Sequence, residues 1–145
     1  MKWDSVERAI RKEYGSRILK WKVHNKTRIY ADVDPALLVP FSRFLFQTLR
    51  ARFIIASGLD TPRNGVEILY HFDFYQLPQV FSLRVFVEKP ALEVESIASF
   101  IKGAEWIERE LTELLGVRFL NHPNPAHLIL PEDWPEGVYP LRRDS

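Results

Sequence analysis

Residues 66–88 read VEILYHFDFYQLPQVFSLRVFVE and contain two runs in which apolar and polar side chains alternate. Alternation with a period of two residues is typical of a β-strand that buries one face. The runs cover residues 66–74 and 83–87, and Pro78 lies in the connection between them. This stretch therefore predicts a β-hairpin, and it places the rest of the chain in the context of a sheet.

The chain before this hairpin predicts a helix and a second hairpin. Apolar side chains recur every four residues in 4–14 and the pattern stops at Gly15, which is typical of a short amphipathic helix. Residues 19–33 alternate between apolar and polar side chains on both sides of a turn at 25–26. That pattern predicts two paired strands.

A second helix and a short strand are predicted between the two hairpins. Asp34 is a good N-cap and Pro35 a good first-turn residue, and apolar side chains from Leu38 onward share one face of the helix that follows. Residues 53–56 form a short apolar run, which the turn-forming residues between 58 and 65 are expected to close.

The predicted order of elements is α-β-β-α-β-β-β, followed by a helical segment at 96–115 and an extended proline-rich tail. Paired strands interrupted by single helices indicate an α+β fold, a two-layer sandwich with a mixed or antiparallel sheet. A length of 145 residues fits one domain in all. Within it we expect an α+β domain at 1–103, a helix at 104–116 packed on or beside it, with Gly116 as its C-cap, and an extended tail at 117–145.

Composition excludes several classes of function. The 20 basic and 19 acidic residues leave a net charge of +1, so the chain lacks the single-sign field that favours nucleic acids or membrane surfaces. The absence of cysteine excludes disulfides and cysteine-ligated metal or iron-sulfur sites within these 145 residues. The glycines form no nucleotide-binding motif, and the N-terminal segment resembles neither a signal peptide nor a spanning helix. We therefore expect a soluble, cytoplasmic chain.

The helix near the C-terminus carries the first candidate site. Glu105, Arg109 and Glu113 follow at intervals of four residues, so Arg109 has a carboxylate one turn away on either side. This spacing fits an exposed ladder of ion pairs on a surface helix. It also fits a face that binds a partner protein. A hydrolase that uses Glu108, Glu113 and His122 is a remote alternative, because acid–base catalysis needs a pocket and a raised pKa.

Metal binding and nucleic-acid binding are weaker alternatives. His122 and His127 flank two prolines, which break the helix that would hold two ligands one turn apart, and no acidic or cysteine ligand stands at zinc-site spacing. Near the N-terminus, basic residues are interleaved with Tyr14 and Trp21, a pattern that can bind nucleic acid. Acidic residues dilute this cluster, and the predicted helix and hairpin account for both aromatic side chains as core. Its basic residues are Arg8, Arg11, Lys12, Arg17, Lys20, Lys22 and Lys26.

The proline-rich tail is too apolar for a solvated linker and needs a surface to lie on. Its prolines keep it extended and lower the entropy cost of ordering it when it docks. A surface on its own domain and a surface on a neighbouring protein are equally compatible with the sequence. The apolar residues are Leu128, Ile129, Leu130, Trp134, Val138, Tyr139 and Leu141, and the tail closes with Arg142, Arg143 and Asp144.

These C-terminal residues resemble the signature of a known family. The stretch EWIERELTELLGVRF, followed by HP, HLILPEDWPEG and PLRRD, is similar to the hydrophilic C subunit of NADH:quinone oxidoreductase, respiratory complex I. It is also similar to the homologous subunit of energy-converting membrane-bound nickel-iron hydrogenases. The positions of the signature are Glu108, Arg109, Glu110, Glu113, His122, Pro123, Trp134, Pro140, Leu141, Arg142, Arg143 and Asp144, with Arg143 in place of the family's lysine.

The resemblance implies a non-catalytic assembly subunit of a peripheral arm. Its helix and tail are then expected to dock a large hydrogenase-like subunit and a small iron-sulfur subunit, with the matching residues at the interface. It implies no cofactor or metal in this chain; iron-sulfur clusters, and nickel-iron in a hydrogenase, belong to the partners.

The resemblance also implies a location. It puts the chain on the cytoplasmic side of a membrane-bound complex, in contact with the membrane only through that complex, and leaves open whether the complex is a quinone reductase or a hydrogenase. The alternative function is a small nucleic-acid-binding module that uses the basic N-terminal region.

Overall fold

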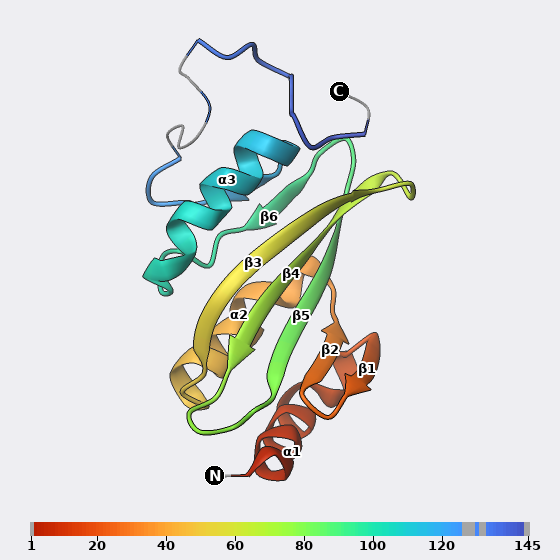
Figure 1. Cartoon of the computed structure of the whole chain (residues 1–145), viewed down its shortest axis with the longest axis vertical. Coiled ribbons are helices and arrows are strands. Elements are labelled where there is room, and N and C mark those ends of the chain that lie inside the picture. Colours follow the sequence, from red (N-terminus) through yellow and green to blue (C-terminus); the bar gives the residue numbers. More distant parts are fainter. Residues whose placement is uncertain (1, 126–129, 131–132, 144–145) are drawn as a thin grey trace.

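A mixed five-stranded sheet forms the centre of the computed structural model, which describes residues 2–125, 130 and 133–143 (Figure 1). Its strands are β1 (Lys20–Asn25), β2 (Arg28–Asp32), β3 (Arg52–Thr61), β4 (Gly65–Asp73) and β5 (Val80–Glu88). Their spatial order is β1-β2-β5-β4-β3. Neighbouring strands run antiparallel except for β2 and β5, which run parallel. The sheet is mixed because of that single parallel pair.

The hairpin formed by β4 and β5 confirms the prediction made from alternating side chains. The two strands pair without a register shift from Gly65 opposite Glu88 to Asp73 opposite Val80. In β4 every second side chain from Val66 onward is buried, and the side chains between them are only half-buried. One face of the sheet therefore forms the core and the other face is more open.

Helices cover the core face of the sheet. They are α1 (Trp3–Tyr14), α2 (Leu38–Arg43) and α3 (Glu105–Leu115). Tyr14 of α1 stacks on Phe41 of α2 with ring centroids 4.2 Å apart, and Phe41 also lies against Phe81 of β5. Figure 1 views the sheet from its uncovered side, with α2 behind the strands. One layer of helices packed on one sheet forms the two-layer α+β fold that the sequence predicts.

The second helix is irregular at both ends. Asp34 caps it as expected, since its Oδ1 accepts a hydrogen bond from the backbone N–H of Ala36 at 2.9 Å. A 3-10 turn at Pro35–Leu37 precedes α2, and a π-helical turn at Phe44–Thr48 follows it. Pro40 lies inside α2, where it supplies no backbone N–H for a helical hydrogen bond.

β3 is longer than the sequence predicts. The expected strand covers residues 53–56, whereas β3 continues to Thr61. The sequence favours Gly58 and Asp60 as turn residues, but both have packing reasons to stand in a strand. A Cβ atom on Gly58 would lie 2.7 Å from Leu115 Cδ1, so glycine lets α3 approach β3 closely. Asp60 is buried and pairs with Lys89 Nζ at 2.8 Å.

The helical segment predicted at 96–115 is wrong in its first half. A 3-10 turn occupies Lys102–Ala104 and α3 begins only at Glu105. The sequence did not predict two short strands, β6 (Glu93–Glu95) and β7 (Arg118–Leu120). In the chain β6 precedes α3 and β7 follows it, and the two strands pair in parallel. The backbone N–H of Ser96 extends this pairing by donating to Leu120 O at 2.9 Å. The backbone before α3 is therefore held by a strand, not by a helical turn.

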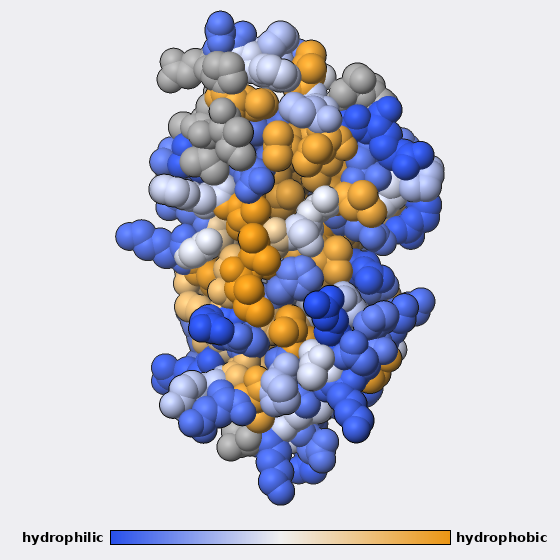
Figure 2. All heavy atoms as spheres, viewed as in Figure 1, coloured by the Kyte–Doolittle hydropathy of each residue, from blue (hydrophilic) through white to orange (hydrophobic). Residues whose placement is uncertain are grey.

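The uncovered face of the sheet carries an apolar band. Figure 2, seen from the same side as Figure 1, shows apolar residues running along β3. Ile54, Ile55 and Leu59 of β3 are all exposed. Among the helices of the described chain, none combines the length and the apolar character needed to cross a membrane.

Candidate functional site

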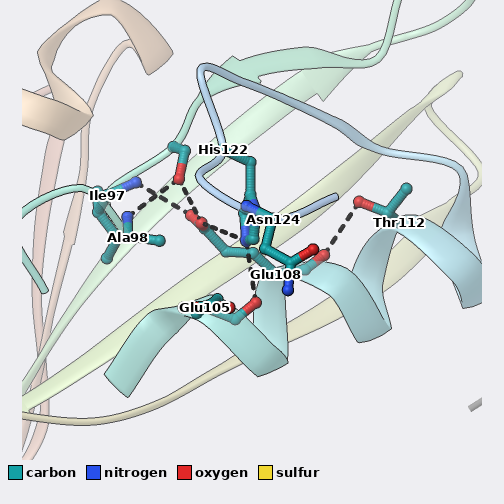
Figure 3. Close-up of polar contacts among 8 residues, drawn as sticks. Ile97, Ala98, Glu105, Glu108, Thr112, His122 and Asn124 are labelled. Carbon is teal, nitrogen blue, oxygen red and sulfur yellow. Dashed lines mark hydrogen bonds and ion pairs between the residues drawn. The ribbon is translucent and has the colours of Figure 1, made fainter. Parts of the chain in front are cut away.

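A fully buried carboxylate anchors α3 to the segment before it. Glu108 Oε1 accepts a hydrogen bond from Ser96 Oγ at 2.6 Å, and its Oε2 accepts one from the backbone N–H of Ile97 at 3.1 Å (Figure 3). Ser96 Oγ in turn accepts from the backbone N–H of Ala98 at 3.0 Å. Buried backbone N–H groups need partners, and this carboxylate supplies one where no helix or strand does. We call Glu108, Ser96 and His122 the polar clasp.

His122 completes the polar clasp through both nitrogens of its ring. Its Nε2 lies 2.9 Å from the carbonyl oxygen of Glu105, which can only accept, so Nε2 is the donor of this hydrogen bond. Its Nδ1 accepts from the backbone N–H of Asn124 at 2.9 Å. The same ring stands 3.7 Å from Glu108 Oε1, and its side chain is almost fully buried. The clasp therefore joins three segments: the loop after β6, α3, and the chain after β7.

Burial raises the pKa of Glu108 from 4.5 to about 7, although the hydrogen bonds from Ser96 and Ile97 partly oppose this shift. Tyr70 is a buried residue of β4. Its burial is the main cause that raises the pKa of its hydroxyl well above 10.0, and the charge of Glu108 is the second cause. A general acid must reach its substrate, and Glu108 has no exposed surface. The hydrolase hypothesis therefore has no support in the geometry, even though the raised pKa is present.

The stability of the chain should depend on the protonation of Glu108. Because its pKa is higher in the folded chain than its ordinary 4.5, the folded state binds more protons between pH 4.5 and about 7, and stability should fall as pH rises across that interval. The loss should be on the order of 3 kcal/mol. Urea unfolding of the wild type and of Glu108→Gln from pH 5 to 8 measures it. A pH dependence that is equally steep in Glu108→Gln would assign it to other groups.

The described part of the tail lies on its own chain, at the C-terminal end of α3. The backbone N–H of Leu141 donates to Leu114 O at 2.9 Å, and that of Arg143 donates to Asp60 Oδ2 at 2.6 Å. Arg142 Nη1 donates to Leu115 O at 3.3 Å. Gly116 ends α3 with a φ of +79°, and a Cβ there would lie 2.8 Å from the ring of Tyr139. We call residues 133–143 the strap.

The expectation that Glu113 is exposed on the outer face of the helix is wrong. This side chain is buried, and its Oε2 accepts from the backbone N–H of Leu130 at 3.2 Å. The helical spacing alone places Glu113 on an outer face, but the returning tail covers that face. Arg109, Thr112 and Glu113 of α3 line a cavity of about 410 Å³, together with Pro125, Leu130 and residues 134–139 of the strap.

The other predicted site residues lie on α3 and the strap, except Pro123, which follows β7. Arg109, Glu110 and Arg142 are half-buried, as is Trp134, whose Nε1 donates to Val138 O at 2.8 Å. Pro123, Pro140, Leu141 and Arg143 are exposed. The cavity brings Arg109, Glu113 and Trp134 together, and the polar clasp brings Glu108 and His122 together. Asp144, His127, Leu128 and Ile129 lie outside the described residues.

Trp106 is a candidate binding residue that the sequence analysis missed. It stands on α3 with 67% of its surface exposed. A tryptophan that a helix presents to solvent is typical of a binding anchor. Its exposure could have been predicted from the sequence, because residue 106 does not share the apolar helix face of Ala104, Ile107 and Leu111.

The two weaker alternatives, metal binding and nucleic-acid binding, gain no support from the described residues. Within residues 2–125, 130 and 133–143, no three His, Cys, Asp or Glu side chains gather in a way that could hold a metal ion. The aromatic residues of the basic N-terminal region are engaged inside the fold. Tyr14 stacks on Phe41, and Trp21 lies under the guanidinium of Arg11, 4.1 Å from the ring centroid.

The family described as "Respiratory-chain NADH dehydrogenase, 30 Kd subunit" has a model that matches residues 31–145. The chain belongs to this family. The match confirms the resemblance drawn from the C-terminal residues, and it includes α3, β7 and the strap as well as most of the sheet. The family gives no support to the nucleic-acid alternative.

Curated relatives in this 30 kDa subunit family are subunits of respiratory complexes. The chain is 37% identical over 121 residues to the C subunit of F(420)H(2) dehydrogenase from Methanosarcina mazei, a match that covers 82% of this chain and 75% of the relative. It is 36% identical over 90 residues to the J subunit of NAD(P)H-quinone oxidoreductase from Prochlorococcus marinus, a match that covers 57% of this chain and 50% of the relative. The chain therefore spans three quarters of the first relative and half of the second.

Two solved structures share the fold of this 30 kDa subunit family member. A chain of the membrane-bound sulfane sulfur reductase, described as "an archaeal respiratory membrane complex", superposes with a TM-score of 0.84 at 18% identity and covers 97% of this chain and 84% of that one. A trypsin-resistant fragment of Nqo5 superposes with a TM-score of 0.64 at 16% identity, over 86% of this chain and 99% of the fragment. At these identities the likeness establishes the common fold.

Proposed function

We propose that this chain is a non-catalytic assembly subunit in the peripheral arm of a complex-I-like oxidoreductase or a related membrane-bound complex. In this proposal α3 and the strap form the docking surface. A large hydrogenase-like subunit and a small iron-sulfur subunit bind there. The family match and the names of the relatives support membership of a multi-subunit respiratory complex.

The observation that carries the proposal is the exposure of Trp106 on a helix that is fixed on two sides. The polar clasp holds the first half of α3, and the strap holds its C-terminal end. A rigid element that presents a large aromatic side chain loses little conformational entropy when a partner covers it. Leu141 of the strap is also exposed, so apolar surface is present on both parts of the proposed docking surface.

Under this proposal the buried acidic residues have a structural role. Glu108 and Glu113 shape α3 and hold its neighbours, whereas Arg109, Glu110 and the end of the strap provide polar contacts at the rim. The chain holds no cofactor; the electron-carrying clusters belong to the partners. The chain lies on the cytoplasmic side of the membrane, bound to it through the other subunits. Whether the complex reduces a quinone or is a hydrogenase depends on those subunits.

Trp106→Ala should reduce the yield of the assembled complex about tenfold or more, because a buried interface tryptophan commonly contributes about 2 kcal/mol or more. The measurement is affinity purification of the tagged chain from detergent-solubilised native membranes, with partner subunits quantified by mass spectrometry. Tyr75→Ala is the matched control, since this aromatic is 82% exposed in the turn between β4 and β5, at the other end of the sheet from α3 (Figure 1).

Three results would decide between the alternatives. Retention of partners by Tyr75→Ala and their loss from Trp106→Ala support the docking surface. Equal retention by both variants would overturn the role of α3. A wild-type chain that purifies without any large or iron-sulfur subunit would overturn the assembly function itself.

A further inference from the structure

The two edges of the sheet differ in how they are protected. β1 and β3 are the edge strands, because the order is β1-β2-β5-β4-β3. β1 carries Lys20 and Lys22, and lysine on an edge is a common device against unwanted strand pairing. β3 reads FIIASGL from Phe53 to Leu59, without a charge or a proline. An uncharged edge of this length would promote aggregation unless another strand covers it.

The outer edge of β3 is also regular enough to pair. A register shift between Phe53 and Ile55 disturbs its start, but from Ile55 to Thr61 it pairs with β4 residue by residue. Between described residues, the backbone hydrogen bonds of 53–59 all belong to the β3–β4 ladder. The strand therefore has a row of backbone donors and acceptors on its outer side that β4 does not use.

The side chains of β3 fit the same use. Gly58 faces α3, where Leu111 and Leu115 pack against it, so the core side of β3 is filled. On the uncovered side Ile55 and Leu59 are exposed, and Figure 2 shows apolar surface running along β3 on that side. A strand added beside β3 would bury part of this band and satisfy the backbone edge at the same time.

The position of β3 next to the proposed docking surface indicates which molecule supplies the added strand. β3 packs directly against α3 at Gly58, and the strap ends on Asp60, which is the penultimate residue of β3. The edge is thus continuous with α3 and the strap. A protein that covers α3 is adjacent to this edge.

We propose that a partner protein of the complex contributes an extended segment that pairs with β3 as a sixth strand of the sheet. The segment has apolar side chains at alternate positions, next to Ile55 and Leu59, and no charged residue facing the band. This inference rests on the proposed assembly function, and it adds the mode of binding, β-strand addition, and the chemistry of the bound segment.

Hydrogen exchange of the full chain, alone and within the complex purified from native membranes, tests strand addition directly. Amides of residues 53–59 on the outer edge should exchange at least about tenfold more slowly in the complex, whereas those of β1 should not change. If partner subunits co-purify but the β3 amides exchange as they do in the isolated chain, strand addition is wrong and the assembly function stands. If no partner co-purifies, the assembly function itself has failed. Protection that grows with the concentration of the isolated chain would identify a second copy as the occupant and overturn the proposal.

A charge on the edge provides a second, independent readout. Leu59 and Val23 are each 60% exposed, on β3 and β1 respectively, so Leu59→Lys and Val23→Lys are matched substitutions. We expect Leu59→Lys to reduce co-purification of partners about tenfold, and Val23→Lys to leave it unchanged. Circular dichroism melts of both variants confirm that each remains folded. Equal co-purification of the two variants would contradict strand addition at β3.

Discussion

Glu108→Ala should lower the free energy of unfolding by about 3 kcal/mol, measured by urea unfolding near pH 6. The substitution removes the acceptor of the Ser96 hydroxyl and of the Ile97 backbone N–H, and both donors stay buried. It also leaves a cavity beneath α3. The loss should be largest in the loop before α3, so amides of residues 96–98 should lose protection from hydrogen exchange.

Glu108→Gln separates the hydrogen bonds from the charge. The amide oxygen can accept from Ile97, and the amide nitrogen can donate to Ser96 Oγ, so the shape and both contacts are kept. Because glutamine does not titrate, this variant lacks the pH-dependent loss expected for the wild type, and near pH 6 we expect it to be at least as stable as the wild type. If the alanine and glutamine variants were equally unstable, the hydrogen bonds of the polar clasp would not be the stabilising feature.

Gly58→Val should lower the free energy of unfolding by about 2 kcal/mol and loosen α3 from the sheet. The new Cβ would lie 2.7 Å from Leu115 Cδ1 and 2.8 Å from Leu111 Cδ2, closer than carbon atoms pack. Valine adds two methyl groups to this contact, so the leucine ends cannot all turn aside. Thermal unfolding followed by circular dichroism measures the loss.

The adjacent residue provides the control for the glycine. Ser57 lies on the uncovered side of β3, and Ser57→Val introduces the same side chain into the same strand without reaching α3. We expect it to be close to neutral, because valine favours strands and the contact that is lost, between Ser57 Oγ and His71 Nε2 at 3.3 Å, is exposed. A destabilisation as large as that of Gly58→Val would mean that β3 tolerates no bulk on either face, and the close approach of α3 would not be the cause.

Elements with a long, one-sided pattern were predictable from the sequence. Val6, Ile10 and Tyr14 repeat along one face of α1 and are all buried, and the alternation in β4 marks its buried side chains correctly. Each of these elements buries one face against a flat neighbour, so its period is visible in its own residues. The C-cap at Gly116 was also correct, since its φ of +79° favours glycine.

The features that the sequence analysis did not predict depend on contacts between residues distant in the chain. Strands of three residues, such as β6 and β7, are too short to show a period, and they exist because each supplies the other with hydrogen bonds. Glu108 is buried because Ile97 and Ser96 present donors to it, and a helical wheel contains no information about that loop. Glu113 is buried because the tail returns over it. Local patterns therefore predicted the sheet and its first helix, but not the environment of the candidate site.

The parallel pair in the sheet also has a consequence for synthesis of the chain. β2 ends at Asp32, but its neighbour β5 begins only at Val80, and β1 has no partner strand in the described sheet other than β2. At ribosomal speeds of about 5–20 residues per second, roughly 2–10 seconds pass between completion of the N-terminal hairpin and the start of synthesis of β5, the strand that anchors it. During that interval α2, β3 and β4 emerge, and the long β4–β5 hairpin can close first. Because of this order of synthesis, β5 is the strand that joins the early β1–β2 hairpin to the later strands β3 and β4. A translational pause before residue 80 would prolong the time during which the β1–β2 hairpin has no neighbouring strand.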